Sequence, residues 1–191
     1  MKRIVIFASG SGTNAENLIR FFHNNSEAGV VQVLTNNPRA KVIDRCNSLN
    51  ISCLCFNRTA FYNTNDVLDL LEMKNPDLIV LAGFLWKIPE TLIAAFPDKI
   101  VNIHPALLPK YGGKGMYGMH VHQAVIDKGE KESGITIHYV NENYDEGAII
   151  FQAKCPVGAI DTPESLVEKI HALEMKHFPK VVESLLFGEH G

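Results

Sequence analysis

Short apolar segments alternate with helical patterns through the first half of the chain, and this alternation limits the possible folds more than any other feature. Five apolar runs have the length of strands that are buried on both faces, at residues 4–8, 30–34, 51–56, 78–81 and 100–103. Three helical patterns lie between them, at residues 13–23, 42–49 and 67–73. The alternation predicts βαβ units, and right-handed crossovers then give an α/β fold with a doubly wound, mostly parallel sheet.

The pattern changes after residue 104. A glycine-rich stretch at 111–119 predicts a loop, and a helix is expected over 121–128. Residues 134–140 and 148–157 are typical of two longer strands joined through a turn, which predicts antiparallel strands added to the sheet. A long C-terminal helix follows, kinked at Pro179, and its apolar face is expected to hold Leu166, Ile170, Leu173, Phe178, Val181 and Leu185.

Charge and length exclude several classes of protein. The 191 residues carry 18 Lys and Arg against 21 Asp and Glu, and a net charge of −3 gives no basic face for nucleic acid or for a membrane surface. No apolar run approaches the ~18 residues of a transmembrane helix, and the apolar start is more typical of a buried strand than of a signal peptide. We therefore expect one domain over residues 1–191, in the cytoplasm.

The cysteine and histidine spacings predict no metal site. His120 and His122 are two residues apart and would not share a face of a helix. The cysteines match neither a zinc motif nor a redox CxxC pair, so we expect reduced thiols. These cysteines are Cys46, Cys53, Cys55 and Cys155.

The turn after the first predicted strand has the composition of an anion site. It reads Gly10-Ser11-Gly12-Thr13-Asn14 and leads into a helix whose free N–H groups would attract a phosphate. Gly10, Gly12 and Ala15 also fit a loose dinucleotide fingerprint, but the acid expected after the second strand is missing, and Thr35-Asn36-Asn37 stands there. A phosphate therefore fits better than a dinucleotide, and a tight turn without a ligand is the alternative.

The carboxyl end of the fifth predicted strand is the second candidate site. Asn102 and His104 fall on one face of this strand, at the edge where doubly wound sheets bind ligands. An amide beside an imidazole can stabilise an oxyanion and move a proton, although a histidine that only caps a strand is the alternative. Asp145, between the two late strands, would raise the pKa of His104 and orient it if the two meet, and His138 either supports that site or packs.

Together these residues resemble the phosphoribosylglycinamide formyltransferase family. The resemblance covers essentially the whole chain and is carried by Gly10–Asn14, Ala82-Gly83-Phe84, the octapeptide Asn102-Ile103-His104-Pro105-Ala106-Leu107-Leu108-Pro109, and Asp145-Glu146-Gly147. It implies a Rossmann-like formyltransferase fold. It also implies transfer of the formyl group of 10-formyltetrahydrofolate, as cosubstrate, to the amino group of 5-phosphoribosylglycinamide in purine (IMP) biosynthesis.

The resemblance implies a role for each matching position. Asn102, His104 and Asp145 would be catalytic, with His104 as the proton donor. The ribonucleotide would be bound by Gly12, Thr13, Asn14 and Glu174. The folate would contact Arg58 near its glutamate tail, Leu85, Trp86, Lys87, Ile88, Asn102, Asn141 and Asp145. Residues 1–100 would then form a nucleotide- and phosphate-binding half, and residues 101–191 a catalytic and folate-binding half.

The sequence departs from the family at two places. Trp86-Lys87 stands where many members have Arg-Ile, and the 112–119 loop is longer than in many members. Other readings stay open: a hydrolase like formyltetrahydrofolate deformylase, an NADP-binding oxidoreductase or nucleotide sensor, and, with less support, a formyltransferase that acts on initiator methionyl-tRNA. We expect small-molecule substrates, no metal, no nucleic acid or membrane partner, and a monomer or homodimer.

Overall fold

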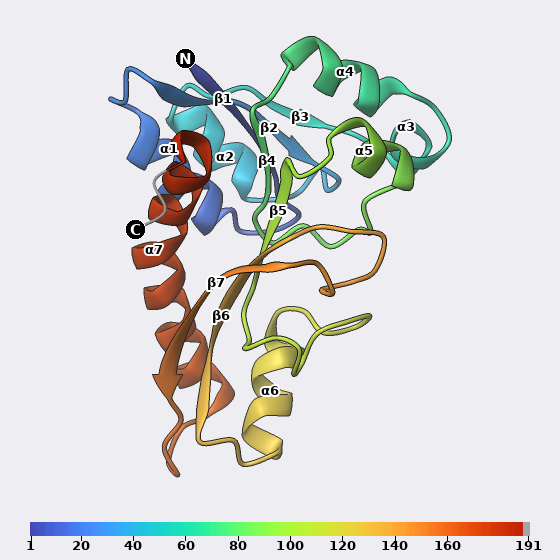
Figure 1. Ribbon diagram of the computed structural model, residues 1–191. Helices are drawn as coiled ribbons and strands as arrows, with labels where there is room; N and C mark the ends of the chain where they lie inside the picture. Colours follow the sequence, from blue (N-terminus) through green and yellow to red (C-terminus); the bar gives the residue numbers. More distant parts are fainter. Residues whose placement is uncertain (189–191) are drawn as a thin grey trace.

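A seven-stranded, mostly parallel sheet forms the centre of the protein, as the alternation of apolar runs predicts (Figure 1). The structure is a computed structural model and describes residues 1–188. The strand order is β3-β2-β1-β4-β5-β6-β7, and only the pairs β5–β6 and β6–β7 are antiparallel. The strands are β1 (Lys2–Phe7), β2 (Ala28–Thr35), β3 (Cys53–Cys55), β4 (Leu78–Leu81), β5 (Ile100–His104), β6 (Glu132–Tyr139) and β7 (Ile149–Pro156).

Helices cover both faces of this sheet. They are α1 (Thr13–Phe22), α2 (Val42–Ser48), α3 (Arg58–Tyr62), α4 (Asp66–Lys74), α5 (Glu90–Ala95), α6 (Met119–Asp127) and α7 (Pro163–Phe187). The apolar periodicity predicts five of them, and it misses α3 and α5 because five or six residues are too few to show a helical period. Among the described helices, none combines the length and apolar character that a membrane crossing requires.

Alternate side chains of β1 enter two separate cores. Ile4 and Ile6 pack with buried residues of α1, α2 and α7, whereas Val5 and Phe7 pack with buried residues of α3, α4 and α5. All four side chains are at most 1% exposed, which explains why the strand is apolar from Ile4 to Phe7. The first core also includes residues of β6 and α6, so it links the two halves of the chain.

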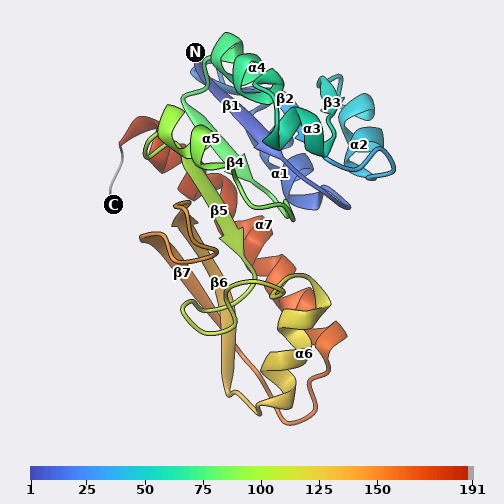
Figure 2. The same ribbon diagram turned by 90° about the vertical axis from the view of Figure 1, so that its right-hand side faces the viewer.

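The antiparallel strands β6 and β7 extend away from the parallel part of the sheet, and α6 and α7 run beside them (Figures 1 and 2). β6 pairs with β5 so that Asn102 lies opposite His138. The turn between β6 and β7 contains Asp145, which adopts a left-handed backbone conformation with φ of 57°. The turn therefore lies beside the carboxyl end of β5, where Asp145 contacts Asn102 and His104.

The long helix α7 differs in detail from its prediction. Its buried stripe advances by four residues at a time and consists of Leu166, Ile170, Glu174, Phe178, Val182 and Leu186. The expected face members Leu173, Val181 and Leu185 are only partly buried. This stripe packs against α1, α6 and the sheet. It contains the polar residue Glu174, so a pattern of apolar residues alone does not identify it.

The helix α7 runs through Pro179 as one continuous element. Proline has no N–H, so the carbonyl of Met175, four residues earlier, lacks its partner within the helix. The side-chain amide of Asn17, on α1, donates a hydrogen bond to this carbonyl at 3.0 Å. The proline therefore creates a point of attachment between α1 and α7.

Candidate active site

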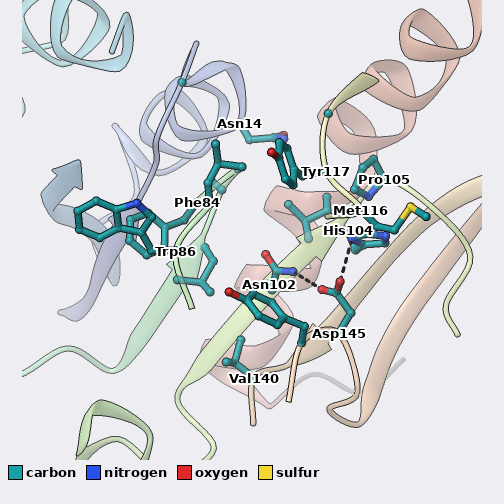
Figure 3. A pocket seen from close by; sticks show the side chains of 18 of the residues that line it. Asn14, Phe84, Trp86, Asn102, His104, Pro105, Met116, Tyr117, Val140 and Asp145 are labelled. Atoms are coloured by element: carbon teal, nitrogen blue, oxygen red, sulfur yellow. Dashed lines mark hydrogen bonds and ion pairs between the residues drawn. The ribbon is translucent and has the colours of Figure 1, made fainter. Parts of the chain in front are cut away.

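A cavity of 530 Å³ opens where the strand order changes direction, at the carboxyl ends of β1, β4 and β5. Ligands of doubly wound sheets bind at this place, and the volume lies in the range that is usual for small-molecule and cofactor sites. Loops after all three strands line the cavity, together with α7 and the turn between β6 and β7. Figure 3 shows Asn102, His104 and Asp145 at one side of it, with Phe84 and Trp86 across from them.

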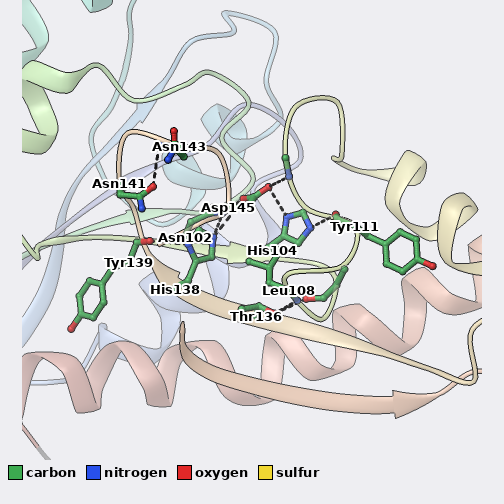
Figure 4. Close-up of polar contacts among 12 residues, drawn as sticks. Asn102, His104, Leu108, Tyr111, Thr136, His138, Tyr139, Asn141, Asn143 and Asp145 are labelled. Carbon is green, nitrogen blue, oxygen red and sulfur yellow. Dashed lines mark hydrogen bonds and ion pairs between the residues drawn. The ribbon is translucent and has the colours of Figure 1, made fainter. Parts of the chain in front are cut away.

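The structure brings Asn102, His104 and Asp145 together. The Nδ1 atom of His104 lies 3.6 Å from Oδ2 of Asp145, and Nδ2 of Asn102 lies 3.4 Å from Oδ1 of the same carboxylate. Figure 4 shows the His104 ring between Asp145 and Tyr111. The carboxylate thus joins the two side chains that the strand alternation alone places on one face.

The contacts of His104 fix where its protons lie. Its Nε2 atom is 2.7 Å from the carbonyl oxygen of Tyr111, which can only accept, so Nε2–H donates. Nδ1 then faces the carboxylate, and it is the nitrogen that gains or loses a proton. The neutral ring turns a lone pair toward Asp145, whereas the charged ring turns an N–H toward it.

The pKa of His104 is set by opposing influences. Burial lowers the pKa of this ring, which is only 4% exposed, and His138 lowers it further. Asp145 and the Tyr111 carbonyl raise the pKa of His104, as predicted for Asp145, but the net pKa lies below the ordinary value. Without substrates the ring is therefore mostly neutral at pH 7, and a charge developing beside it would favour its protonation.

The amide of Asn102 is held by two acceptors. The Nδ1–H of His138 donates to the Tyr139 carbonyl at 2.8 Å. In the neutral ring, Nε2 accepts from Nδ2 of Asn102 at 3.1 Å, and the same atom lies 3.5 Å from Oδ1 of Asp145, toward which it turns an N–H when the ring is charged. The second N–H of Asn102 points to Asp145 at the longer distance of 3.4 Å. This longer contact is the one that a substrate oxygen can replace at least cost, while His138 keeps the amide oriented.

Asp145 is held ionised by its neighbours. Burial alone raises the pKa of Asp145, but contacts with His138, with His104 and with the backbone N–H of Gly113 lower it, and the net pKa lies below the ordinary value. The Gly113 N–H donates to Oδ2 at 2.9 Å. The loop at 111–119 therefore contacts the His104–Asp145 pair twice, through the backbone of Tyr111 and of Gly113. The sequence patterns give no sign of either contact.

The glycine-rich turn after β1 has the conformation of an anion site. Gly12 precedes α1 with φ of 73°, and a Cβ atom at this position would lie 2.5 Å from the side chain of Val42. Only glycine therefore fits here without displacing α2. No side chain caps α1, so the first backbone N–H groups of the helix, next to Thr13 and Asn14, face the cavity that these residues line.

Asn14 and Glu174 form a buried polar pair at the same end of the cavity. The side-chain amide of Asn14 donates to Oε2 of Glu174 at 2.9 Å. Burial raises the pKa of Glu174, which is 8% exposed, and the contacts with Asn14 and His171 offset this only in part. The Oδ1 atom of Asn14 has no partner among the described residues. Both side chains therefore have polar atoms that could form hydrogen bonds with a ligand.

The buried carboxyl of Glu174 predicts a pH-dependent penalty to stability. Below about pH 4 this group is protonated in both the folded and the unfolded chain and costs nothing. As pH rises, the unfolded chain ionises first because the folded-state pKa is raised, so stability falls. We expect Glu174→Gln, which keeps an oxygen for Asn14, to exceed the parent in free energy of unfolding at pH 8 and to match it at low pH.

Urea denaturation at pH 8 and near pH 4 measures both differences. Glu168→Gln, at an exposed position of the same helix, is the control and should behave like the parent at both pH values. A Glu174→Gln protein that is less stable than the parent at pH 8 would show that the ionised carboxylate supports the fold.

The residues predicted to contact a folate fall into two groups. Leu85, Trp86, Lys87, Ile88 and Asn141 line the cavity, and the backbone N–H of Leu85 is fixed by the Ser9 hydroxyl at 3.0 Å. Arg58 lies outside the lining residues. Its guanidinium carbon lies 4.8 Å from the centre of the Trp86 ring and 5.8 Å from that of Tyr62, so it stacks beside the cavity mouth.

Sequence reasoning assigned no role to several other side chains of the cavity, among them Lys114, Tyr117, His122 and His171. Lys114 and Tyr117 come from the loop at 111–119, for which no pattern predicts a position. His171 could have been found, because it precedes Glu174 by three residues and so shares its side of α7. Within residues 1–188 no group of histidine, cysteine or acidic side chains has the arrangement of a metal site.

Comparison with known proteins gives one family. Residues 2–182 match the family model described as formyl transferase. The phosphoribosylglycinamide formyltransferase of Bacillus subtilis (strain 168) is 36% identical over 191 residues, which cover 97% of this chain and 95% of that protein. The chloroplastic enzyme of the same name from Arabidopsis thaliana is 38% identical, and the match covers 96% of this chain and 65% of that longer protein.

Solved structures agree with these sequence relatives. The crystal structure of phosphoribosylglycinamide formyltransferase from Bacillus halodurans superposes with a TM-score of 0.85 at 36% identity, over 97% of this chain and 95% of that one. The structure of glycinamide ribonucleotide transformylase 1 from Symbiobacterium toebii gives a TM-score of 0.89 at 30% identity, over 98% and 89% of the two chains.

Proposed function

The chain belongs to the formyl transferase family, in the branch of the phosphoribosylglycinamide formyltransferases, and from this premise we propose its reaction. The protein transfers the formyl group of 10-formyltetrahydrofolate, the donor, to the amino group of 5-phosphoribosylglycinamide, the acceptor. The products are the N-formyl ribonucleotide and tetrahydrofolate. The reaction is a step of purine biosynthesis.

The acceptor binds at the end of the cavity near α1 and α7. The turn at Gly12, Thr13 and Asn14 offers backbone N–H groups and the positive end of a helix dipole to the phosphate. Glu174 lies next to Asn14 and accepts hydrogen bonds from ribose hydroxyls or from the glycinamide. This pairing of a phosphate turn with a buried acid is what the acceptor requires.

The donor binds across from the acceptor. Its pterin lies against the backbone of Leu85–Ile88 on one side and the segment from Asn141 to Asp145 on the other, both of which line the cavity. Its glutamate tail extends to the mouth of the cavity, where the guanidinium of Arg58 stacks on the Trp86 ring. An arginine stacked on an aromatic ring keeps its N–H groups free for a carboxylate.

The chemistry needs one proton carrier and donors for an oxyanion. The uncharged amine of the acceptor bonds to the formyl carbon, and the formyl oxygen gains negative charge. The N–H of Asn102 and the protonated His104 stabilise that oxygen, each by a few kcal/mol. The bond from carbon to the folate nitrogen then breaks and this nitrogen takes the proton from Nδ1 of His104. The attacking nitrogen gives its extra proton back to the neutral His104 ring, directly or through water, so the ring is charged again and no proton is gained or lost overall. Asp145 stabilises the charged ring in between.

The observation that carries this proposal is the opening of the phosphate turn and of the His104–Asp145 pair onto one cavity. Two substrates must meet for a group transfer, and a single cavity with an anion site at one end allows it. Residues 1–100 supply the phosphate turn, and residues 101–191 supply Asn102, His104 and Asp145. The two halves do not separate these roles completely. Glu174, in the second half, contacts the acceptor, and Leu85–Ile88, in the first half, contact the donor.

Incubation with 10-formyltetrahydrofolate, with and without the acceptor, tests this function. We expect tetrahydrofolate to form only when 5-phosphoribosylglycinamide is present, in equal amount to the formylated ribonucleotide. Turnover that ignores the ribonucleotide would instead identify a hydrolase like formyltetrahydrofolate deformylase. Tight binding of NADPH without formyl transfer would favour the oxidoreductase or sensor.

Binding can be followed separately from turnover. Trp86 is the one tryptophan of the chain and lines the cavity, so occupancy by the donor should change the protein fluorescence. Trp86→Phe keeps an aromatic ring beside Arg58 and removes the signal, which makes it the control for inner-filter effects of the folate.

A further inference from the structure

His122 is a buried imidazole in the wall of the cavity that the proposed reaction does not use. It lies on α6, is 4% exposed and is one of the residues that line the cavity. No hydrogen bond within residues 1–188 involves its Nδ1 atom, which has no access to solvent. Buried polar atoms are nearly always satisfied, so this ring calls for an explanation.

The surroundings of His122 fix its tautomer. A proton on Nδ1 would leave a buried N–H without an acceptor, and such orphaned donors are rare. The proton therefore resides on Nε2, and Nδ1 holds a lone pair. Burial, together with the charges of His171 and His104, lowers the pKa of His122 to about 4, so the ring stays neutral at pH 7. The group that a ligand can meet is a neutral N–H donor.

The neighbours of His122 place it between the two ends of the acceptor. His104 belongs to the reacting centre, and His171 lines the wall of the cavity near Glu174 and Thr13. All three rings line the same cavity, and the helices α6 and α7, which carry His122 and His171, pack against each other. A ligand that spans the phosphate turn and the reacting centre passes this position.

We propose that Nε2–H of His122 donates a hydrogen bond to the amide carbonyl oxygen of the bound 5-phosphoribosylglycinamide. This inference rests on the proposed function. A neutral donor suits a neutral carbonyl oxygen, whereas the phosphate is served by the turn at Gly12. The carbonyl carbon is one bond away from the carbon that bears the attacking amine, so a bond to its oxygen orients the nucleophile toward the formyl carbon.

His122→Phe tests the role, because phenylalanine fills the space of the ring and removes the donor. We expect the KM for the acceptor to rise about 10-fold and the KM for 10-formyltetrahydrofolate to stay within about twofold, as for loss of one neutral hydrogen bond. His122→Gln places an amide N–H near the position of Nε2 and should restore most of the loss. His120→Phe, two residues away on the exposed side of α6, is the matched control and should change neither constant.

Two outcomes would overturn the inference. One is an unchanged acceptor KM in a folded His122→Phe protein, and the other is an equal rise in the Phe and Gln variants, which would point to packing alone. Nitrogen NMR of the parent provides an independent readout, since a proton found on Nδ1 also contradicts the assignment. If the parent itself transfers no formyl group to the acceptor, the proposed function has failed, and that result is separate from these.

Discussion

Replacing His104 with alanine should lower the rate of formyl transfer at least ~100-fold while the protein stays folded. In the proposed reaction the ring supplies both a donor to the developing oxyanion and the proton for the leaving nitrogen, and the other imidazoles of the cavity are engaged elsewhere or lie apart from Asp145. The Nε2 atom of His138 also lies 3.5 Å from Oδ1 of Asp145, but its Nδ1 is engaged by the Tyr139 carbonyl and its Nε2 by Asn102. No contact between His122 and Asp145 is present among the described residues. Steady-state rates with both substrates saturating measure the loss directly.

Folding of the His104→Ala protein is checked by its thermal unfolding, because the ring lies in a cavity wall rather than in either apolar core. The His120→Ala protein serves as the control for loss of an imidazole and should keep the parent rate. A near-normal rate in folded His104→Ala protein would remove His104 from the mechanism.

The second large effect is expected for Asp145→Ala, also at least ~100-fold. Asp145 raises the pKa of His104 against the opposing influence of burial, and it contacts Asn102 as well. Its removal lowers the pKa of His104 further, so a smaller fraction of the ring carries a proton at any given pH. The residual activity should therefore depend on pH with its alkaline limb shifted to lower pH than in the parent.

The pH profile of Asp145→Asn separates this electrostatic role from loss of volume, since asparagine keeps the shape and removes the charge. Glu146→Gln, the adjacent exposed acid, is the matched control and should leave both rate and profile unchanged. An Asp145→Asn protein whose profile coincides with that of the parent would show that the carboxylate does not act through the imidazole.

The sequence predicts the parallel part of the fold well because each of its strands contains a short, mostly apolar run. The run at 78–81 coincides with β4, and the two antiparallel strands are confirmed. The run at 51–56 shortens to the three residues of β3, which lies at the sheet edge where pairing is available on one side only. The short helices α3 and α5 are stabilised by the packing of Phe61 and Leu92 in the second core. No local sequence pattern predicts this packing.

For the candidate site, the sequence predicts which strand end carries the chemistry and which turn suits an anion. The meeting of Asp145 with His104 required the pairing of β5 with β6 and the left-handed turn that follows, and it was predicted only as a condition. The net lowering of the His104 pKa was missed, because the degree of burial is a property of the packed protein. The contacts from Tyr111 and Gly113 lie in an aperiodic loop and are visible only in three dimensions.

The hydrogen bond from Asn17 to the carbonyl that Pro179 leaves free has a consequence for the order of biosynthesis. It fixes α7 to α1 next to the contact between Asn14 and Glu174, whose residues are 160 positions apart in the chain. During translation the segment that offers the phosphate turn is made early, and the segment that completes the ribose side is made late. On the proposed assignment of the acceptor site, the site for the ribonucleotide is therefore complete only after α7 has left the ribosome and docked.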